Sequence, residues 1–446
     1  MLRSLFTCLI LLFVENTFAQ LSVSPDKDHL VTKSGKPFFW LGDTAWELFH
    51  RLSREEADEY LENRARKGFT VIQAVVLAEL DGLRVPNYYG DLPLIGEDPA
   101  RPNEAYFKHV DYVVRKANGL GLVIAMLPSW GDKWNKKWGV GPEVFNTKNA
   151  ALFGEYVGRR YRDKNIVWVL GGDRDCEEPQ DYEILRAMAA GLKKGDGGKH
   201  LMTFHPQGGK SSSDFFKEDD WIDFHMSQTG HSQQSRNYLF TIKHKQMVPR
   251  KPHLDGEPRY EDHPNDFNPV KNGWMDDVDA RQCAYWSVMA GAFGHTYGNH
   301  NIWQFYTFGR APVSWARTNW KTALDHPGAY QMGIMKRLFE SRNWTNMRMN
   351  NSLIVNSNPE DQSHMVAAIS ADSSFIMVYT PLGDSISVNT SALRSDFIQA
   401  SWFNPRDGEL KKLEPFKNIA KAGFRPHSSG RGSDWVLIVD AIAKPR

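Results

Sequence analysis

The feature that most limits the possible folds is a series of continuous apolar stretches, each ending in polar or aromatic residues. In the clearest of them, the apolar residues from Ile166 to Leu170 are followed by two glycines and then by Asp173 and Asp175. A strand that is buried on both faces has such an uninterrupted apolar sequence. Because catalytic residues of parallel α/β barrels lie at the carboxyl ends of the strands, Asp173 is a candidate catalytic acid.

Stretches of this kind alternate with predicted helices, the first of which has a capping box at Ser53-Arg-Glu-Glu56 and stops at Gly68. Strands are predicted over residues 36–46, 69–79, 122–127, 165–170, 201–205, 221–228, 253–257 and 295–303, and further helices over 106–118, 148–162, 182–194, 236–247, 277–292 and 326–341. The alternation predicts an α/β fold, a (β/α)8 TIM barrel. A doubly wound sheet is the alternative, but no glycine-rich phosphate-binding loop follows the first strand.

The pattern changes near Met347, where short alternating runs separated by turn residues replace the helices. Strands are predicted over residues 352–356, 365–369, 374–380, 386–388, 400–403 and 434–439. Short strands at this spacing predict a small antiparallel β-sandwich. The chain therefore divides into a barrel over residues 20–345 and a sandwich over residues 346–446. Since no low-complexity linker separates them, we expect the two domains to pack directly against each other.

Residues 1–19 have the features of a signal peptide: a basic start, an apolar run over Leu5–Val14 and a small residue at Ala19. The apolar run is too short to span a bilayer, and no other stretch approaches the length of a membrane helix. We expect an exported protein that begins near Gln20 and that is periplasmic, bound at the cell surface or extracellular.

Composition and motif spacing exclude several classes of protein. The 54 basic and 53 acidic residues nearly balance, which argues against nucleic-acid binding. Only Cys176 and Cys283 follow the signal peptide, so we expect isolated thiols and no disulfide framework. No His-x-His, His-Glu-x-x-His or Gly-x-Ser-x-Gly motif occurs, so neither a metal, nor another cofactor, nor a catalytic serine is expected. The oligomeric state cannot be predicted from these features.

A second acid, Glu257, ends the predicted strand 253–257 and so occupies a position like that of Asp173. Two carboxyl groups at the ends of different barrel strands suit a glycosidase, in which one acid protonates the leaving oxygen and the other attacks the sugar or activates water. The apolar strand end would raise the pKa of Asp173, while Arg259 and Tyr260 would keep Glu257 ionised. Alternatively, Asp173 or Asp175 caps the following helix.

Further polar and aromatic residues at the predicted strand ends would line one cleft around the two acids. These residues are Asp43, Trp46, Glu79, Trp130, His205, His225, Gln228, Tyr297 and Trp303. The chain contains fifteen Trp residues, and aromatic rings stack on the C–H faces of sugars. Core packing is the alternative explanation for most of these aromatic residues.

Several segments carry a resemblance to a known family. They are Phe38-Phe-Trp-Leu-Gly-Asp-Thr-Ala-Trp46, Arg64-Ala-Arg-Lys-Gly-Phe-Thr-Val-Ile-Gln73, Trp168-Val-Leu-Gly-Gly-Asp173, Asp255-Gly-Glu-Pro258 and, near the C-terminus, Ser401-Trp-Phe-Asn-Pro-Arg-Asp-Gly408. The first four resemble the apiosidase-like glycosidases, glycoside hydrolase family 140. The last is similar to the β-sandwich that follows the barrel in that family and that is provisionally named a collagen-binding domain.

The resemblance implies an exo-acting enzyme that removes β-linked apiose from galacturonic acid in rhamnogalacturonan II, a pectin of the plant cell wall. It also implies that the acid/base follows the fourth strand and that the nucleophile ends the seventh, positions that Asp173 and Glu257 match. Such a pair would retain the anomeric configuration, with the carboxyl groups about 5–5.5 Å apart, whereas inverting enzymes need roughly 6.5–9.5 Å.

One feature departs from the wider clan, in which the pair after the fourth strand is usually Asn-Glu. The matching pair here is Gly172-Asp173, and its shorter acid would suit a small branched furanose such as apiose. The departure leaves open that Asp175 is the acid. It also leaves open another plant glycan, such as a β-galactoside or an arabinofuranoside, or a barrel that binds carbohydrate without cleaving it.

Overall fold

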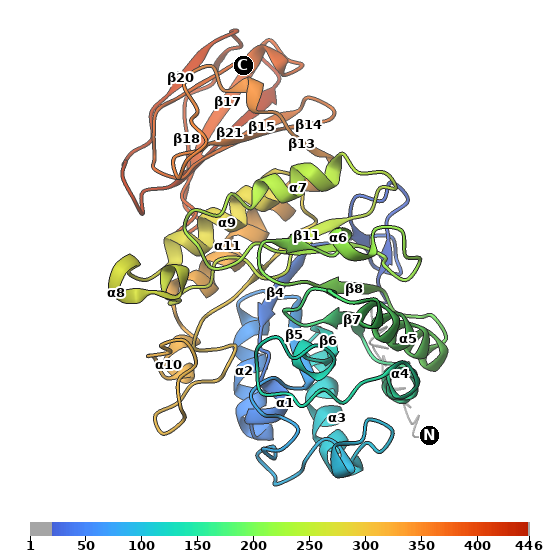
Figure 1. Ribbon diagram of the computed structural model, residues 1–446. Helices are drawn as coiled ribbons and strands as arrows, with labels where there is room; N and C mark the ends of the chain where they lie inside the picture. The colour runs from blue at the N-terminus through green and yellow to red at the C-terminus, as the bar shows by residue number, and fades with distance from the viewer. Residues whose placement is uncertain (1–19, 445–446) are drawn as a thin grey trace, which may run out of the picture.

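A computed structural model describes residues 20–444 of the chain (Figure 1). The predicted signal peptide, residues 1–19, lies outside the described residues. Within the described part, no helix is both long and apolar enough to cross a membrane. A three-stranded antiparallel sheet comes first in the chain and contains β1 (Ser22–Val23), β2 (Leu30–Val31) and β3 (Pro37–Phe38).

Eight strands then form the predicted barrel. They are β4 (Trp40–Thr44), β5 (Val71–Leu77), β6 (Val123–Ser129), β7 (Ile166–Gly171), β8 (Met202–His205), β10 (His225–Gln228), β11 (His253–Asp255) and β12 (Gly294–Tyr297). Parallel pairing runs in the order β12-β4-β5-β6-β7-β8, and β10 pairs with β11. Backbone hydrogen bonds bridge the two remaining gaps: Asp223 N donates to Met202 O over 2.9 Å, and Phe293 N donates to His253 O over 3.1 Å. The short strand β9 (Lys210–Ser211) pairs antiparallel with β10, on the edge opposite β11.

Helices follow the strands and cover the outside of the barrel. They are α1 (Leu48–Arg51), α2 (Arg54–Arg66), α3 (Glu104–Gly119), α4 (Thr147–Tyr161), α5 (Pro179–Asp196), α6 (Ser213–Phe216), α7 (Tyr238–Lys245), α8 (Pro269–Asn272), α9 (Asp277–Met289), α10 (Trp320–Ala323) and α11 (Pro327–Glu340). The predicted capping box is confirmed at α2, where Glu56 N donates to Ser53 Oγ (3.2 Å) and Ser53 N donates to Glu56 Oε2 (3.1 Å).

Side chains along the barrel strands alternate between the interior and the surrounding helices. The interior cluster includes Trp40, Val71, Val167, Val169 and Met226. The cluster beneath the helices includes Leu41, Ile72, Trp168, Leu170 and Phe204. A residue at the carboxyl end of a strand therefore points either into the barrel mouth or toward a helix, according to its place in this alternation.

The C-terminal part is an antiparallel sandwich, as predicted. Its large sheet contains β13 (Met347–Met349), β14 (Val366–Ser370), β15 (Phe375–Thr380), β21 (Trp435–Ile442), β17 (Phe397–Phe403), β18 (Leu410–Lys412) and β19 (Phe416–Lys417), and its small sheet pairs β16 (Ile386–Val388) with β20 (Ala422–Phe424). The predicted strand 352–356 is wrong, because residues 351–353 form a 3-10 turn and only Ile354 makes a bridge, to Val388.

The large sheet packs directly on the barrel, as the missing linker suggested. In Figure 1, α7, α9 and α11 lie between the barrel and the sandwich. On the facing side of the sheet, Met377 and Tyr379 belong to the same buried cluster as the barrel helices, and the Tyr379 ring stacks on Tyr285 of α9 with 4.8 Å between centroids. Arg281 of α9 donates to both carboxylate oxygens of the buried Asp434, over 3.0 and 2.8 Å.

Candidate active site

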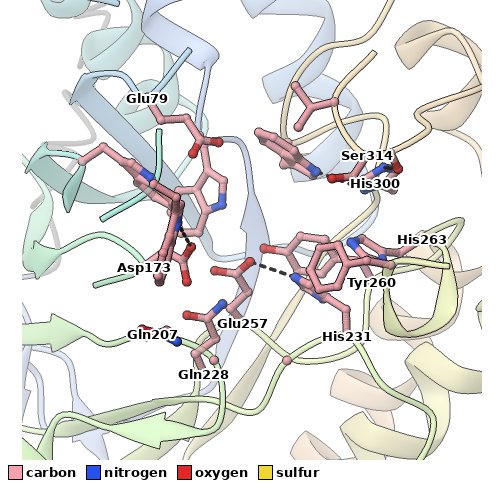
Figure 2. A pocket seen from close by; sticks show the side chains of 18 residues that line it. Glu79, Asp173, Gln207, Gln228, His231, Glu257, Tyr260, His263, His300 and Ser314 are labelled. Carbon is pink, nitrogen blue, oxygen red and sulfur yellow. Dashed lines mark hydrogen bonds and ion pairs between the residues drawn. The ribbon is translucent and has the colours of Figure 1, made fainter. Parts of the chain in front are cut away.

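A pocket of about 400 Å³ opens at the carboxyl ends of the barrel strands. Of the residues predicted from the strand ends, the structure brings Trp46, Glu79, Trp130, Asp173, Gln228, Glu257 and Trp303 to this pocket. Residues that the strand pattern did not mark complete the lining: Trp138, Gln207, Gly208, Gly230, His231, Tyr260, His263, Phe267, His300, Val313 and Ser314. Figure 2 shows Glu257 near the centre, with Asp173 on one side and His231, Tyr260 and His263 on the other.

The chain that carries Asp173 leaves β7 in an unusual conformation. Gly171, Gly172 and Asp173 have φ angles of 98°, 96° and 52°, in the left-handed region that favours glycine. A Cβ on Gly172 would lie 2.9 Å from the Trp130 ring and 3.0 Å from Gly131 N, so only glycine fits this close approach. A strained backbone of this kind requires support from its surroundings and is common at functional sites.

Arg174 supplies part of this support. Its Nη1 donates to Asp173 O over 2.6 Å and its Nε donates to Asn135 O over 3.0 Å. Its guanidinium lies 3.8 Å from the centre of the Trp138 ring and also donates to the Trp138 carbonyl. Arg174 thereby fixes Asp173 and the loop that carries Trp138 relative to each other.

The carboxyl group of Asp173 is poised to hold a proton. Burial, together with the nearby charge of Glu257, raises the pKa of Asp173 to about 6. Trp138 Nε1 donates to Asp173 Oδ2 over 3.1 Å, which leaves Oδ1 free to carry the proton. Asp173 is therefore partly protonated near neutral pH, as a general acid must be.

Two histidines keep Glu257 ionised. Burial alone would raise the pKa of Glu257, but contacts with His205 and His231 outweigh it and lower the pKa to about 2. His205 Nε2 lies 3.0 Å from Glu257 Oε2, and His231 Nε2 lies 3.1 Å from Oε1. Since His205 Nδ1 accepts from Asp173 N (3.4 Å), a neutral His205 carries its proton on Nε2, facing Glu257. His205 thus contacts both candidate catalytic residues.

The prediction that Arg259 keeps Glu257 ionised is wrong. The Arg259 guanidinium instead donates to backbone carbonyls of the loop that carries His231, so it acts on Glu257 only through that loop. Tyr260 does line the pocket, and its ring lies 4.4 Å from the His231 ring.

Four of the predicted cleft residues do not line the pocket: His205, which is buried against Glu257, and three residues that point away from it. Asp43 is buried behind the barrel wall, where it accepts hydrogen bonds from Tyr60 and Arg64 of α2, each over 2.6 Å. His225 Nδ1 is 2.9 Å from Ser212 Oγ, and Tyr297 donates to Glu261. All three point toward the helices because they fall on the outward positions of β4, β10 and β12.

Asp175, the alternative acid, does not line the pocket, and its Oδ1 accepts from Gln207 N over 3.2 Å. The pocket does contain a third acid, Glu79, which follows β5. Burial, with the charges of Glu47 and Asp173, raises the pKa of Glu79 well above its usual range. Glu79 therefore holds a proton more readily than an ordinary glutamate, and in its protonated form it can donate a hydrogen bond to a bound ligand.

Cys176 and Cys283 are both free and buried, as predicted. Among residues 20–444, no three His, Cys, Asp or Glu side chains are grouped so that they could hold a metal ion. The side chains that line the pocket carry carboxyl, imidazole, amide, hydroxyl and indole groups.

A comparison with protein families and solved structures identifies similar proteins. The family model described as "Apiosidase-like, catalytic domain" matches residues 24–346. A second family, provisionally named the collagen-binding domain of a collagenase, matches residues 350–440. No curated protein matches the chain.

Two solved structures resemble the whole chain. One, described as a glycoside hydrolase, is 32% identical, has a TM-score of 0.87, and is matched over 96% of this chain and 98% of its own. The other, a glycoside hydrolase family 5 protein from Bacteroides vulgatus, is 30% identical, has a TM-score of 0.87, and is matched over 96% of this chain and 94% of its own. The extent of the family match and these relatives show that the chain is a glycoside hydrolase and belongs to the family of the apiosidase-like catalytic domain.

Proposed function

We propose that the protein is an exo-acting, retaining glycosidase in which Asp173 is the acid/base and Glu257 is the nucleophile. The observation that carries this proposal is the opposite direction of the pKa shifts of two carboxyl groups that line one pocket. A glycosidase needs one protonated and one ionised carboxyl group at the same pH, and this pair satisfies that need. The position of Asp175 outside the pocket favours Asp173 as the acid.

In the first step, a Glu257 oxygen attacks the anomeric carbon while the bond from that carbon to the leaving oxygen breaks. The proton on Asp173 passes to the leaving oxygen, so that Asp173 becomes ionised. In the second step, Asp173 takes a proton from a water molecule, whose oxygen attacks the anomeric carbon and displaces Glu257. The sugar departs with its original configuration, and both carboxyl groups regain their starting states.

The substrate we propose is β-linked apiose on galacturonic acid, as in rhamnogalacturonan II of plant cell walls. The match to the apiosidase-like catalytic domain supports this choice. A pocket of about 400 Å³ is near the lower end of the usual range for ligand sites, which favours one terminal sugar over a polymer chain. Trp46, Trp130 and Trp303 provide apolar surfaces for the sugar. Action outside the cytoplasm is proposed from the sequence of residues 1–19 alone.

Incubation of the purified protein with pectic side-chain oligosaccharides, followed by identification of the released sugar, tests this function. We expect free apiose from the natural protein and none from Glu257→Gln, because an amide is not a nucleophile. Release of galactose or arabinose would agree with the proposed mechanism but would show that the substrate is another plant glycan. Release of no monosaccharide from any plant glycan would contradict the proposal.

A further inference from the structure

His231 lies in the loop between β10 and α7, and one buried arginine holds the backbone of this loop. Arg259 Nε donates to Ser232 O over 3.1 Å, and its Nη2 donates to Gln233 O (2.7 Å) and Ser235 O (2.6 Å). These carbonyl groups follow directly after His231 in the chain. The position of the His231 ring therefore depends on the position of the Arg259 guanidinium.

Arg259 is connected to the sandwich through one side chain of α9. Its Nη1 donates to Gln282 Oε1 over 2.7 Å, and Gln282 Nε2 donates to the Gln362 carbonyl over 2.6 Å. Gln362 belongs to the sandwich segment before β14. Nearby, His364 of the same segment stacks on Tyr238, the first residue of α7, with 4.7 Å between ring centroids. The sandwich thus contacts both the anchor of the loop and the helix that follows it.

A second connection reaches the loop from another sandwich residue. Arg431 Nη2 donates to Asp279 Oδ2 over 2.8 Å, and Gln233 Nε2 donates to the two oxygens of Asp279 over 3.1 and 3.2 Å. Arg431 also pairs with both oxygens of Asp276, each over 2.8 Å. Asp279 therefore receives one hydrogen bond from the sandwich and two from the residue that lies two positions after His231.

We propose that the C-terminal sandwich is a positioning element of the active site, and that Arg431, Gln282 and Arg259 are positioning residues that keep His231 on Glu257. The proposal rests on the proposed function only in that Glu257 is taken as the nucleophile. The loop has no helix or strand of its own. Two backbone hydrogen bonds hold it at His231, from Asp266 N to His231 O (3.0 Å) and from Gly230 N to Glu257 O (3.1 Å), and the side-chain anchors hold the residues that follow. The titratable groups that face His231 are Glu257, Tyr260 and His263.

The variant that tests this most cleanly is Arg431→Gln, because the Arg431 side chain is half exposed and its loss should not unfold the protein. Arg342→Gln is the matched control. Arg342, which follows α11, pairs with Asp440 of β21 and so joins the same two domains by another route. Arg431→Gln loses two ion pairs between the domains and Arg342→Gln loses one, but only Arg431 is connected to the loop.

Hydrogen exchange of residues 229–237 provides a readout that does not depend on activity. We expect Arg431→Gln to increase exchange in this segment several-fold and Arg342→Gln to leave it unchanged. Equal exchange in the two variants would overturn the proposal. This readout keeps the test valid if the protein cleaves no glycoside, so a failure of the proposed function is distinguishable from a failure of this inference.

The pH profile of kcat/KM on an activated aryl glycoside gives the second readout. Because the His231 contact lowers the pKa of Glu257, loosening that contact should move the acidic limb of Arg431→Gln to higher pH, by about half a unit, with no shift in Arg342→Gln. In a His231→Asn background, Arg431→Gln should add no further shift, since the two changes act on one contact. A full additional shift there would show that Arg431 acts by another route and would contradict the proposal.

Discussion

Asp173 and Glu257 have opposite protonation states because different groups touch them. Asp173 accepts a hydrogen bond from the Trp138 indole N–H and lies 3.8 Å from the Arg174 guanidinium and near the charge of Glu257. Its burial has the largest effect on its pKa. Glu257 is more deeply buried, with 8% of its side chain exposed against 25% for Asp173, but each of its oxygens faces an imidazole. The two acids thus differ in protonation state because their polar neighbours differ. His205 is adjacent to both acids.

The first prediction at the residue scale concerns pH. Activity requires Asp173 protonated and Glu257 ionised, so kcat/KM should fall as pH rises through about 6, the raised pKa of Asp173. The acidic limb should lie far lower, because the pKa of Glu257 is shifted down. A pH profile on a substrate with a poor leaving group, whose departure needs a proton, checks this. A profile that stays flat well above neutral pH would exclude Asp173 as the acid.

The second prediction separates Asp173 from Asp175. Asp173→Asn should lose activity on substrates with poor leaving groups, yet keep much of the first-step rate on activated aryl glycosides, whose departure needs no proton. Asp175→Asn should be much milder, because Asp175 does not line the pocket and accepts from the backbone N–H of Gln207. Steady-state rates on the two substrate types compare the variants. The reverse pattern would make Asp175 the acid.

The strands show which parts of the site could be predicted from the sequence. Apolar runs located the first four barrel strands and the continuing alternation with helices located the other four, and hence the ends at which Asp173 and Glu257 lie. Side chains along a strand point alternately to its two faces. An error of one residue in the predicted position therefore reverses the direction in which a strand-end side chain is expected to point. Asp43, between Gly42 and Thr44, points to α2 for this reason.

The loop histidines could not be predicted in the same way. His231, His263 and His300 lie after strands, in segments without a periodic pattern, so no spacing rule fixes their direction. The only signal was that histidines recur shortly after several strands. The anchoring of His231 by Arg259 involves backbone carbonyls, which any residue type provides, and therefore leaves no trace in the sequence.

A prediction at the scale of elements concerns the turn after β7. Gly172→Ala would place a Cβ 2.9 Å from Trp130 at a φ of 96° and so displace Asp173. We expect kcat/KM to fall about 100-fold, since small misplacements of reacting groups have effects of this size. Gly198→Ala, at a φ of 70° with no atom within 4 Å of its Cβ, is the control for backbone strain alone. Similar activity of the two variants would contradict the role of this turn.

The barrel and the sandwich share one buried apolar cluster and one buried ion pair, between Arg281 and Asp434. A chain that ends at Asn346 would expose the barrel side of this interface and leave Arg281 without Asp434. Because truncation exposes apolar side chains such as Tyr285, and burial of a large apolar side chain stabilises a fold by about 1.5–3 kcal/mol, we expect a melting temperature roughly 10 °C lower or a failure to fold. Thermal unfolding of the two chains checks this. A stable, fully active truncated barrel would show that the sandwich is dispensable.

The proposed mechanism requires Glu257 as the nucleophile, and trapping of the covalent intermediate tests this role directly. An activated glycoside of the cleaved sugar with fluorine at carbon 2 slows both steps, while its good leaving group lets the first proceed, so the glycosyl-enzyme should accumulate. Peptide mass spectrometry should then find the added sugar on Glu257 in the natural protein and nowhere in Glu257→Gln. An adduct on another carboxylate, or turnover without an adduct and with an inverted product, would contradict the assignment of Glu257 and the retaining mechanism.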